Sequence, residues 1–180
     1  KSLETALSDV RVVLTRFPGE TIQPLQNASF ANRLGVDLYV SLNFFEQKKG
    51  KHRLSIFHFC TNPTTDFWKQ QNPKLCFIKA HNAHKSSIHT SKTWAQQMHT
   101  KLTTDYAEHF TCTAPLGIPF KPLCGIEAPA LGIEASVQTP QEWSRYIKPL
   151  STSITKIVER HKRAGGLVVF FHKYFWHTVI

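Results

Sequence analysis

Apolar residues follow two different periods along this chain, and the two periods alternate. Residues 10–16 and 36–42 are β-branched and mostly apolar, which is typical of buried strands. Between them, residues 24–34 repeat apolar side chains at helical spacing and precede Gly35, a pattern that predicts a helix and its end. A strand, a helix and a strand at this spacing predict a βαβ unit, with its two strands paired in parallel.

The same alternation continues toward the C-terminus. Residues 54–60 predict a third strand, which places Leu54, Ile56, His58 and Cys60 on one face. Residues 94–110 predict an amphipathic helix, because four large side chains recur every four positions: Trp94, Met98, Leu102 and Tyr106. A second helical pattern begins at Trp143 and continues to Ile157.

Glu134 is the main candidate for chemistry. It follows a short apolar run, residues 130–133, and precedes a polar turn that contains Pro140. An α/β domain displays catalytic groups in this way, at the carboxyl end of a strand. A carboxylate at the end of an apolar strand is partly desolvated, which raises its pKa toward the range of a general base. The alternative is a glutamate that caps the following helix or pairs with a lysine.

Composition argues against some classes of protein but does not identify the function. The 180 residues fit one domain, and 22 Lys and Arg against 12 Asp and Glu give a net charge of +10. Such a surface attracts polyanions, but no helix-turn-helix or RNA-binding signature is visible, so nucleic acid is not the expected partner. No apolar run is long enough for a membrane helix. Four cysteines without C-x-x-C spacing could form up to two disulfides or remain buried thiols.

His58 and Cys60 leave two interpretations open. Both are good metal ligands, and on a strand they lie on the same face. A core histidine beside a buried thiol is the simpler interpretation.

Several segments together resemble the zinc-dependent N-acetylmuramoyl-L-alanine amidases of the amidase-3 type. These enzymes contain Val-Val-Leu-Thr-Arg, then Ala-Asp-Leu-Phe-Val-Ser-Ile-His, then Val-Glu-x-Gly-Phe and Ser-Asn-Pro-x-Glu. This chain has similar segments in the same order, at residues 12–16, 36–43, 133–137 and 138–142. The resemblance implies a three-layer α/β sandwich, with a mainly parallel sheet flanked by helices. It also implies hydrolysis of the amide between the muramoyl lactyl group and L-alanine in peptidoglycan.

The resemblance assigns roles to individual residues. Glu134 stands where the family carries the glutamate that activates a zinc-bound water. Asn43 stands where the family carries a zinc-binding histidine, and the two other zinc ligands would lie before Lys1. Zinc is therefore the cofactor that the family implies, but we expect no metal ligand from the chain as written, because an amide oxygen is a poor zinc donor. Asn43, Phe120 and Leu123 are the expected substrate-binding residues.

Two functions from different classes follow. One is a zinc amidase whose missing ligands lie upstream, with His58 or another histidine taking the place of Asn43. The other is a non-catalytic relative that binds cell-wall glycan or a protein through the same cleft. The expected partner is peptidoglycan or another anionic cell-wall polymer. The expected location is the periplasm, the cell wall or the outside of the cell, with the targeting signal upstream of this chain.

The last segment has no counterpart in the family. We expect an amidase-like domain over residues 1–163 and an apolar, aromatic tail over residues 164–180. Residues 167–180 are apolar on both alternating faces, and an unpaired strand of this kind favours aggregation. The tail should therefore pair with a vacant sheet edge or with a second copy of the chain; contact with a membrane surface is the alternative.

Overall fold

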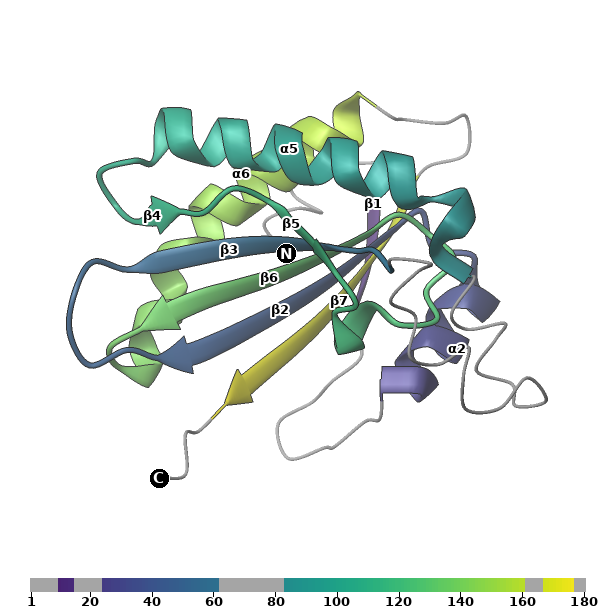
Figure 1. Cartoon of the computed structure of the whole chain (residues 1–180), viewed down its shortest axis with the longest axis horizontal. Helices are drawn as coiled ribbons and strands as arrows, with labels where there is room; N and C mark the ends of the chain where they lie inside the picture. Colours follow the sequence, from purple (N-terminus) through teal and green to yellow (C-terminus); the bar gives the residue numbers. More distant parts are fainter. Residues whose placement is uncertain (1–9, 15–23, 62–82, 161–166, 177–180) are drawn as a thin grey trace.

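The computed structural model describes residues 10–14, 24–61, 83–160 and 167–176. In this part of the chain a seven-stranded sheet lies between helices on its two faces (Figure 1). The expected α/β fold, a three-layer sandwich with a mainly parallel sheet, is confirmed. No helix among the described residues combines the length and the apolar character that crossing a membrane requires.

The sheet has the strand order β1-β7-β2-β6-β3-β4, and β5 also pairs with β3. Neighbouring strands are parallel except β3 and β6, which are antiparallel. The strands are β1 (Val10–Leu14), β2 (Leu38–Glu46), β3 (Arg53–Phe59), β4 (Thr111–Cys112), β5 (Leu116–Ile118), β6 (Ala130–Val137) and β7 (Leu167–Trp176).

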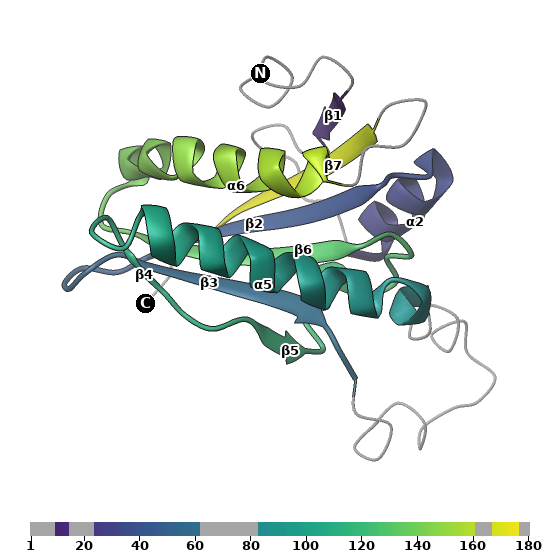
Figure 2. The same ribbon diagram turned by 90° about the horizontal axis from the view of Figure 1, so that it is seen from above.

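Two helices run side by side across one face of the sheet, α5 (Ile88–Asp105) and α6 (Ile147–Glu159) (Figure 2). The helix α2 (Pro24–Leu34) packs against the other face, near one end of the sheet. Short 3-10 turns complete the described elements: η1 (Ala83–Ser86), η2 (Lys121–Leu123) and η3 (Pro140–Tyr146). The helix expected over residues 94–110 is confirmed but begins six residues earlier and ends at Asp105.

Strand alternation divides the core into two apolar clusters. Side chains such as Val40, Ile56 and Ile133 point toward α5 and α6, where they meet Met98 and Ile154. The alternate positions face α2 and η2. Their cluster contains Ala28, Ala31, Val36, Tyr39, Phe59, Leu123, Ile126 and Ala130. The apolar runs of β2 and β6 are therefore buried on both sides, and for β2 the sequence predicted this.

The position of β7 differs from the expectation in two ways. The tail was expected at a sheet edge or on a second copy, but β7 lies between β1 and β2 and pairs with both in parallel. For the same reason β1 and β2 are not neighbours, so the predicted direct pairing of the βαβ unit is wrong. An interior position gives a long apolar strand backbone partners on both edges, which removes the aggregation hazard of an open edge.

The cysteines that the structure describes, Cys60, Cys112 and Cys124, are free thiols. Burial raises the pKa of Cys112 to about 12 and also raises the pKa of Cys124. These two thiols are therefore protonated at neutral pH and behave as core side chains. Cys76 lies outside the described residues.

We expect Val169→Ala to lower the free energy of unfolding by about 2 kcal/mol, because Val169 is fully buried in the interior strand. Leu14→Ala on β1 is the matched control, since Leu14 is 64% exposed and its truncation should cost less than about 0.5 kcal/mol. Urea denaturation of both variants measures the difference. Equal effects of the two substitutions would contradict the interior position of β7.

Candidate functional site

Glu134 lies inside β6, not at its tip. The strand was expected to end before Glu134, but it continues to Val137, because residues 135 and 137 remain apolar and buried. The register pairs Glu134 with Asn43 on β2 and with Ser55 on β3. Residues paired in this way project from the same face of a sheet. Three polar side chains, Asn43, Glu134 and Ser55, therefore lie side by side on three neighbouring strands. They share the face of the sheet opposite α5 and α6.

The surroundings of Glu134 favour its protonated form. Burial raises the pKa of Glu134 above the ordinary value of a glutamate. No described residue donates a hydrogen bond to the carboxylate or forms an ion pair with it, so nothing in this part of the chain offsets the lost hydration. The sequence-based expectation of a partly desolvated carboxyl agrees with this direction of the shift.

Asn43 lies beneath the surface beside Glu134. Its side chain is 3% exposed, and its Oδ1 atom accepts no hydrogen bond in the described part of the protein. Ser41, two residues earlier on the same face of β2, is fully buried, and its hydroxyl likewise has no partner there. Unsatisfied buried groups of this kind are costly, and they concentrate at functional sites.

Two aromatic side chains lie on the same face of the sheet as Glu134, at the position of Gly132. Phe120 precedes η2 and stacks on Phe57 of β3, with 4.9 Å between the ring centroids. The Phe120 ring lies over Gly132, two residues before Glu134, where an added Cβ would approach within 2.6 Å of the ring. Gly132 therefore lets the ring come close to the strand. Phe120 stays partly exposed, so an apolar surface adjoins the carboxyl group.

The three residues expected to bind substrate differ in how deeply their side chains are buried. Phe120 is partly accessible beside Glu134, and Asn43 lies just below the surface. Leu123 is fully buried in the cluster that α2 and η2 share, so its side chain is not accessible to a ligand in this structure. The substrate-binding roles of the three residues stay predictions.

His58 points away from Glu134. It lies on the face of β3 that carries Ile56, whereas Ser55 and Phe57 share the face of Glu134. Burial and the nearby charge of Lys92 lower the pKa of His58, so it is neutral at pH 7. His58 is therefore a core histidine and cannot take the place of Asn43.

The described residues do not fit a zinc ion at this site. Asn43 offers a neutral amide oxygen and Glu134 one carboxylate, whereas a catalytic zinc takes three protein ligands. No group of three His, Cys, Asp or Glu residues close enough to hold a metal occurs within the described ranges.

A polar network follows β6, and sequence reasoning missed it. The carbonyl oxygen of Ser136 accepts hydrogen bonds from Tyr146 Oη at 2.6 Å and from His52 Nδ1 at 3.3 Å. His52 Nε2 lies 3.8 Å from Glu142. The backbone N–H of Gln138 donates to Glu142 at 2.8 Å, and this bond is the main cause of the lowered pKa of Glu142. The network anchors the turn after β6, and the Thr139-Pro140-Gln141-Glu142 segment was its sequence signal.

We expect Glu134→Gln to change the pH dependence of stability. The unfolded chain has the ordinary glutamate pKa and the native protein a raised one. The unfolded state therefore loses its proton first as pH rises, and the wild type loses free energy of unfolding between the two pKa values. The variant stays neutral and lacks this loss.

Denaturant unfolding from pH 4 to pH 8 measures the difference between the two proteins. Glu127→Gln is the control, because Glu127 is exposed. A difference between the wild type and Glu134→Gln that does not vary with pH would contradict the desolvation of Glu134.

Of the comparisons with known proteins, the comparison with solved structures found a match. No family model matches the chain, and no curated protein sequence does. Among solved structures, the chain resembles the crystal structure of N-acetylmuramoyl-L-alanine amidase from Clostridium difficile 630, with a TM-score of 0.56 and 20% sequence identity. The match covers 89% of this chain and 77% of that one. At this identity the similarity shows the fold alone: the chain has the fold of an N-acetylmuramoyl-L-alanine amidase.

Proposed function

We propose that this chain is a distant amidase relative that binds peptidoglycan at the Glu134 site and recognises the amide between the muramoyl lactyl group and L-alanine. One observation carries the proposal: a desolvated, partly exposed carboxyl group beside an aromatic surface, within an amidase fold. Action on peptidoglycan would place the protein in the periplasm, in the cell wall or outside the cell.

Each part of the site matches a part of this ligand. A protonated Glu134 donates a hydrogen bond to the amide carbonyl, and the raised pKa of Glu134 extends the pH range in which this proton is present. The methyl groups of the lactyl unit and of alanine pack on Phe120, whose ring is partly exposed. Asn43 is the register partner of Glu134 on β2 and lies buried beside it, so we assign it a positioning role.

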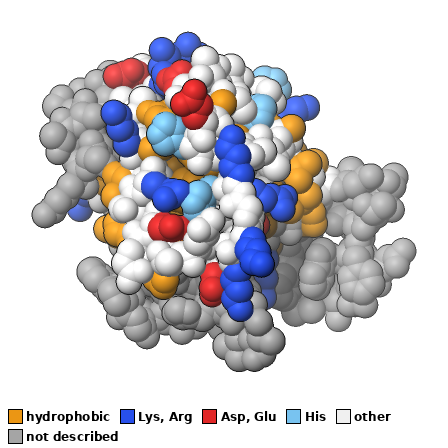
Figure 3. Space-filling view, turned by 90° about the vertical axis from the view of Figure 1, so that its left-hand side faces the viewer, with side chains coloured by type: hydrophobic (Ala, Val, Ile, Leu, Met, Phe, Trp, Pro, Cys, Tyr) orange, Lys and Arg blue, Asp and Glu red, His pale blue; other side chains and the backbone are white. Residues whose placement is uncertain are grey.

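The charge of the surface suits an anionic wall polymer. Lys and Arg side chains outnumber Asp and Glu on the end of the molecule toward which β2 and β6 point (Figure 3). The loop between β2 and β3 contributes three exposed lysines there: Lys48, Lys49 and Lys51. Such a surface raises the local concentration of a polyanion before specific contacts form.

Hydrolysis of the same amide is the second candidate function. An ionised Glu134 with a raised pKa would serve as the general base toward water. This function requires the deprotonated form, so its rate rises with pH, whereas the affinity of the proposed binding falls with pH. We propose binding as the main function, with hydrolysis impaired, because the described residues offer no more than Asn43 and Glu134 in place of the metal site that the family implies.

We expect muramoyl dipeptide to bind the full chain more tightly as pH falls through the pKa of Glu134. Glu134→Gln keeps a hydrogen-bond donor and should bind without this pH dependence, whereas Glu134→Ala should bind about tenfold more weakly. Phe120→Ala should weaken binding several-fold. Calorimetric titration at several pH values measures all four proteins.

Ile147→Ala is the control for Phe120→Ala, since Ile147 is apolar and 42% exposed but lies on α6, across the sheet from Glu134. Release of new amino groups from peptidoglycan, measured in parallel, tests hydrolysis. Binding that is independent of pH in the wild type, or release of amino groups that depends on Glu134 and rises with pH, would contradict the main proposal.

A further inference from the structure

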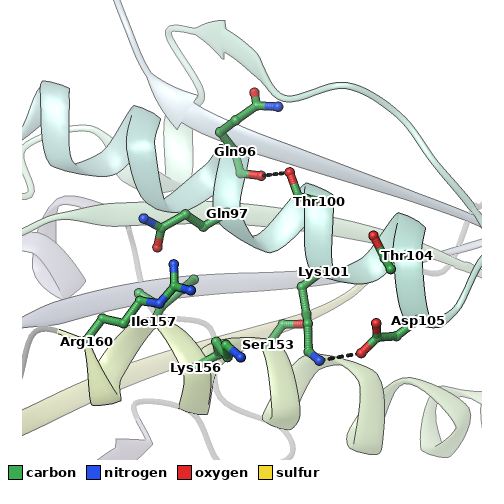
Figure 4. Close-up of a pocket in the computed structure, with 10 residues that line it drawn as sticks. All are labelled: Gln96, Gln97, Thr100, Lys101, Thr104, Asp105, Ser153, Lys156, Ile157 and Arg160. Atoms are coloured by element: carbon green, nitrogen blue, oxygen red, sulfur yellow. Dashed lines mark hydrogen bonds and ion pairs between the residues drawn. The ribbon is translucent and has the colours of Figure 1, made fainter.

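A groove of about 300 Å³ lies between α5 and α6 (Figure 4). Both helices pack on the face of the sheet opposite Glu134, so the groove is separate from the site described above. Gln97 and Lys101 line it from α5, Ser153 and Lys156 line it from α6, and Arg160 lines it from the residue that follows α6.

Two polar atoms of this groove lack partners. Ser153 is 1% exposed, and its hydroxyl forms no hydrogen bond with any described residue. A helical serine normally donates to the carbonyl one turn earlier, so an unpaired buried hydroxyl here is unusual and costly. Across the groove, Gln97 Oε1 is also buried and accepts no hydrogen bond from the described residues.

The groove also has uncompensated positive charge. Lys101 forms an ion pair with Asp105 one turn later on α5. Lys156 and Arg160 are exposed, and neither forms an ion pair within the described ranges. Lys156 in the last turn of α6 and Arg160 at its C-cap both suit the helix dipole. The dipole does not explain the unpaired atoms of Ser153 and Gln97 below them.

We propose that this groove binds a small hydroxylated phosphate, such as a polyol or sugar phosphate. A phosphate monoester carries nearly two negative charges, which match the two unpaired cations, and the Arg160 guanidinium suits its oxygens. The Ser153 hydroxyl donates to a third phosphate oxygen. A ligand hydroxyl donates to Gln97 Oε1, so a hydroxylated phosphate can satisfy both unpaired atoms. The volume lies at the lower end of the range for small-ligand sites.

Calorimetric titration of the full chain with glycerol 3-phosphate tests the proposal, with inorganic phosphate and glycerol as partial probes. Lys156→Gln should weaken the binding of glycerol 3-phosphate at least about tenfold, and Ser153→Ala should weaken it about fivefold. Lys148→Gln is the matched control, because Lys148 is exposed on the same helix and its loss changes the net charge equally. It should change the affinity by less than about twofold.

A second readout separates a binding role of Ser153 from a structural one. Without ligand, Ser153→Ala should raise the unfolding temperature, since it removes an unpaired buried hydroxyl, and yet it should weaken binding. The proposal fails if glycerol 3-phosphate does not bind at millimolar concentration. It also fails if Lys148→Gln weakens the binding of glycerol 3-phosphate as much as Lys156→Gln does. It also fails if Ser153→Ala leaves the affinity unchanged, or if inorganic phosphate binds as tightly as glycerol 3-phosphate.

Discussion

The parallel pairing of β2 with β6 fixes both the core and the candidate site. Its register pairs Tyr39 with Ala130 at one end and Glu46 with Val137 at the other. Alternation along these strands sends one set of side chains toward α5 and α6 and the other set, with Asn43 and Glu134, toward the opposite face. A slip of one residue would bury Glu134 against the helices, so the apolar positions of the strand hold the carboxyl group in place.

Local sequence patterns predicted the elements well but not their neighbours. The long strands and helices followed from periods of two and of three to four residues, which reflect the burial that each segment needs by itself. The short strands β4 and β5 were not predicted, because two or three residues are too few to show a period. Strand order depends on pairing between distant segments. Nothing in residues 36–60 indicates that β6 lies between β2 and β3, and nothing in the tail indicates that β7 lies between β1 and β2. The end of β6 was missed because the apolar run stops at the polar Glu134, whereas the backbone stays in the ladder to Val137.

At the candidate site, too, local features were predictable from the sequence, whereas contacts between distant segments were not. The direction of the pKa shift of Glu134 was predictable, because apolar neighbours in sequence already imply desolvation. The position of His58 was not, since the face on which a strand residue lies relative to another strand requires the register between them. The link from His52 to Glu142 joins residues far apart in the sequence, and Leu123 belongs to the core only because α2 packs over it.

The account depends on a carboxyl group at Glu134 whose pKa lies above the ordinary glutamate value and which, when protonated, donates a hydrogen bond to its ligand. Carbon-13 NMR titration of the labelled side-chain carboxyl, with and without muramoyl dipeptide, measures this directly. The account predicts a pKa above the ordinary glutamate value in the free protein and a further rise when the dipeptide binds. An ordinary pKa that the dipeptide leaves unchanged would contradict it.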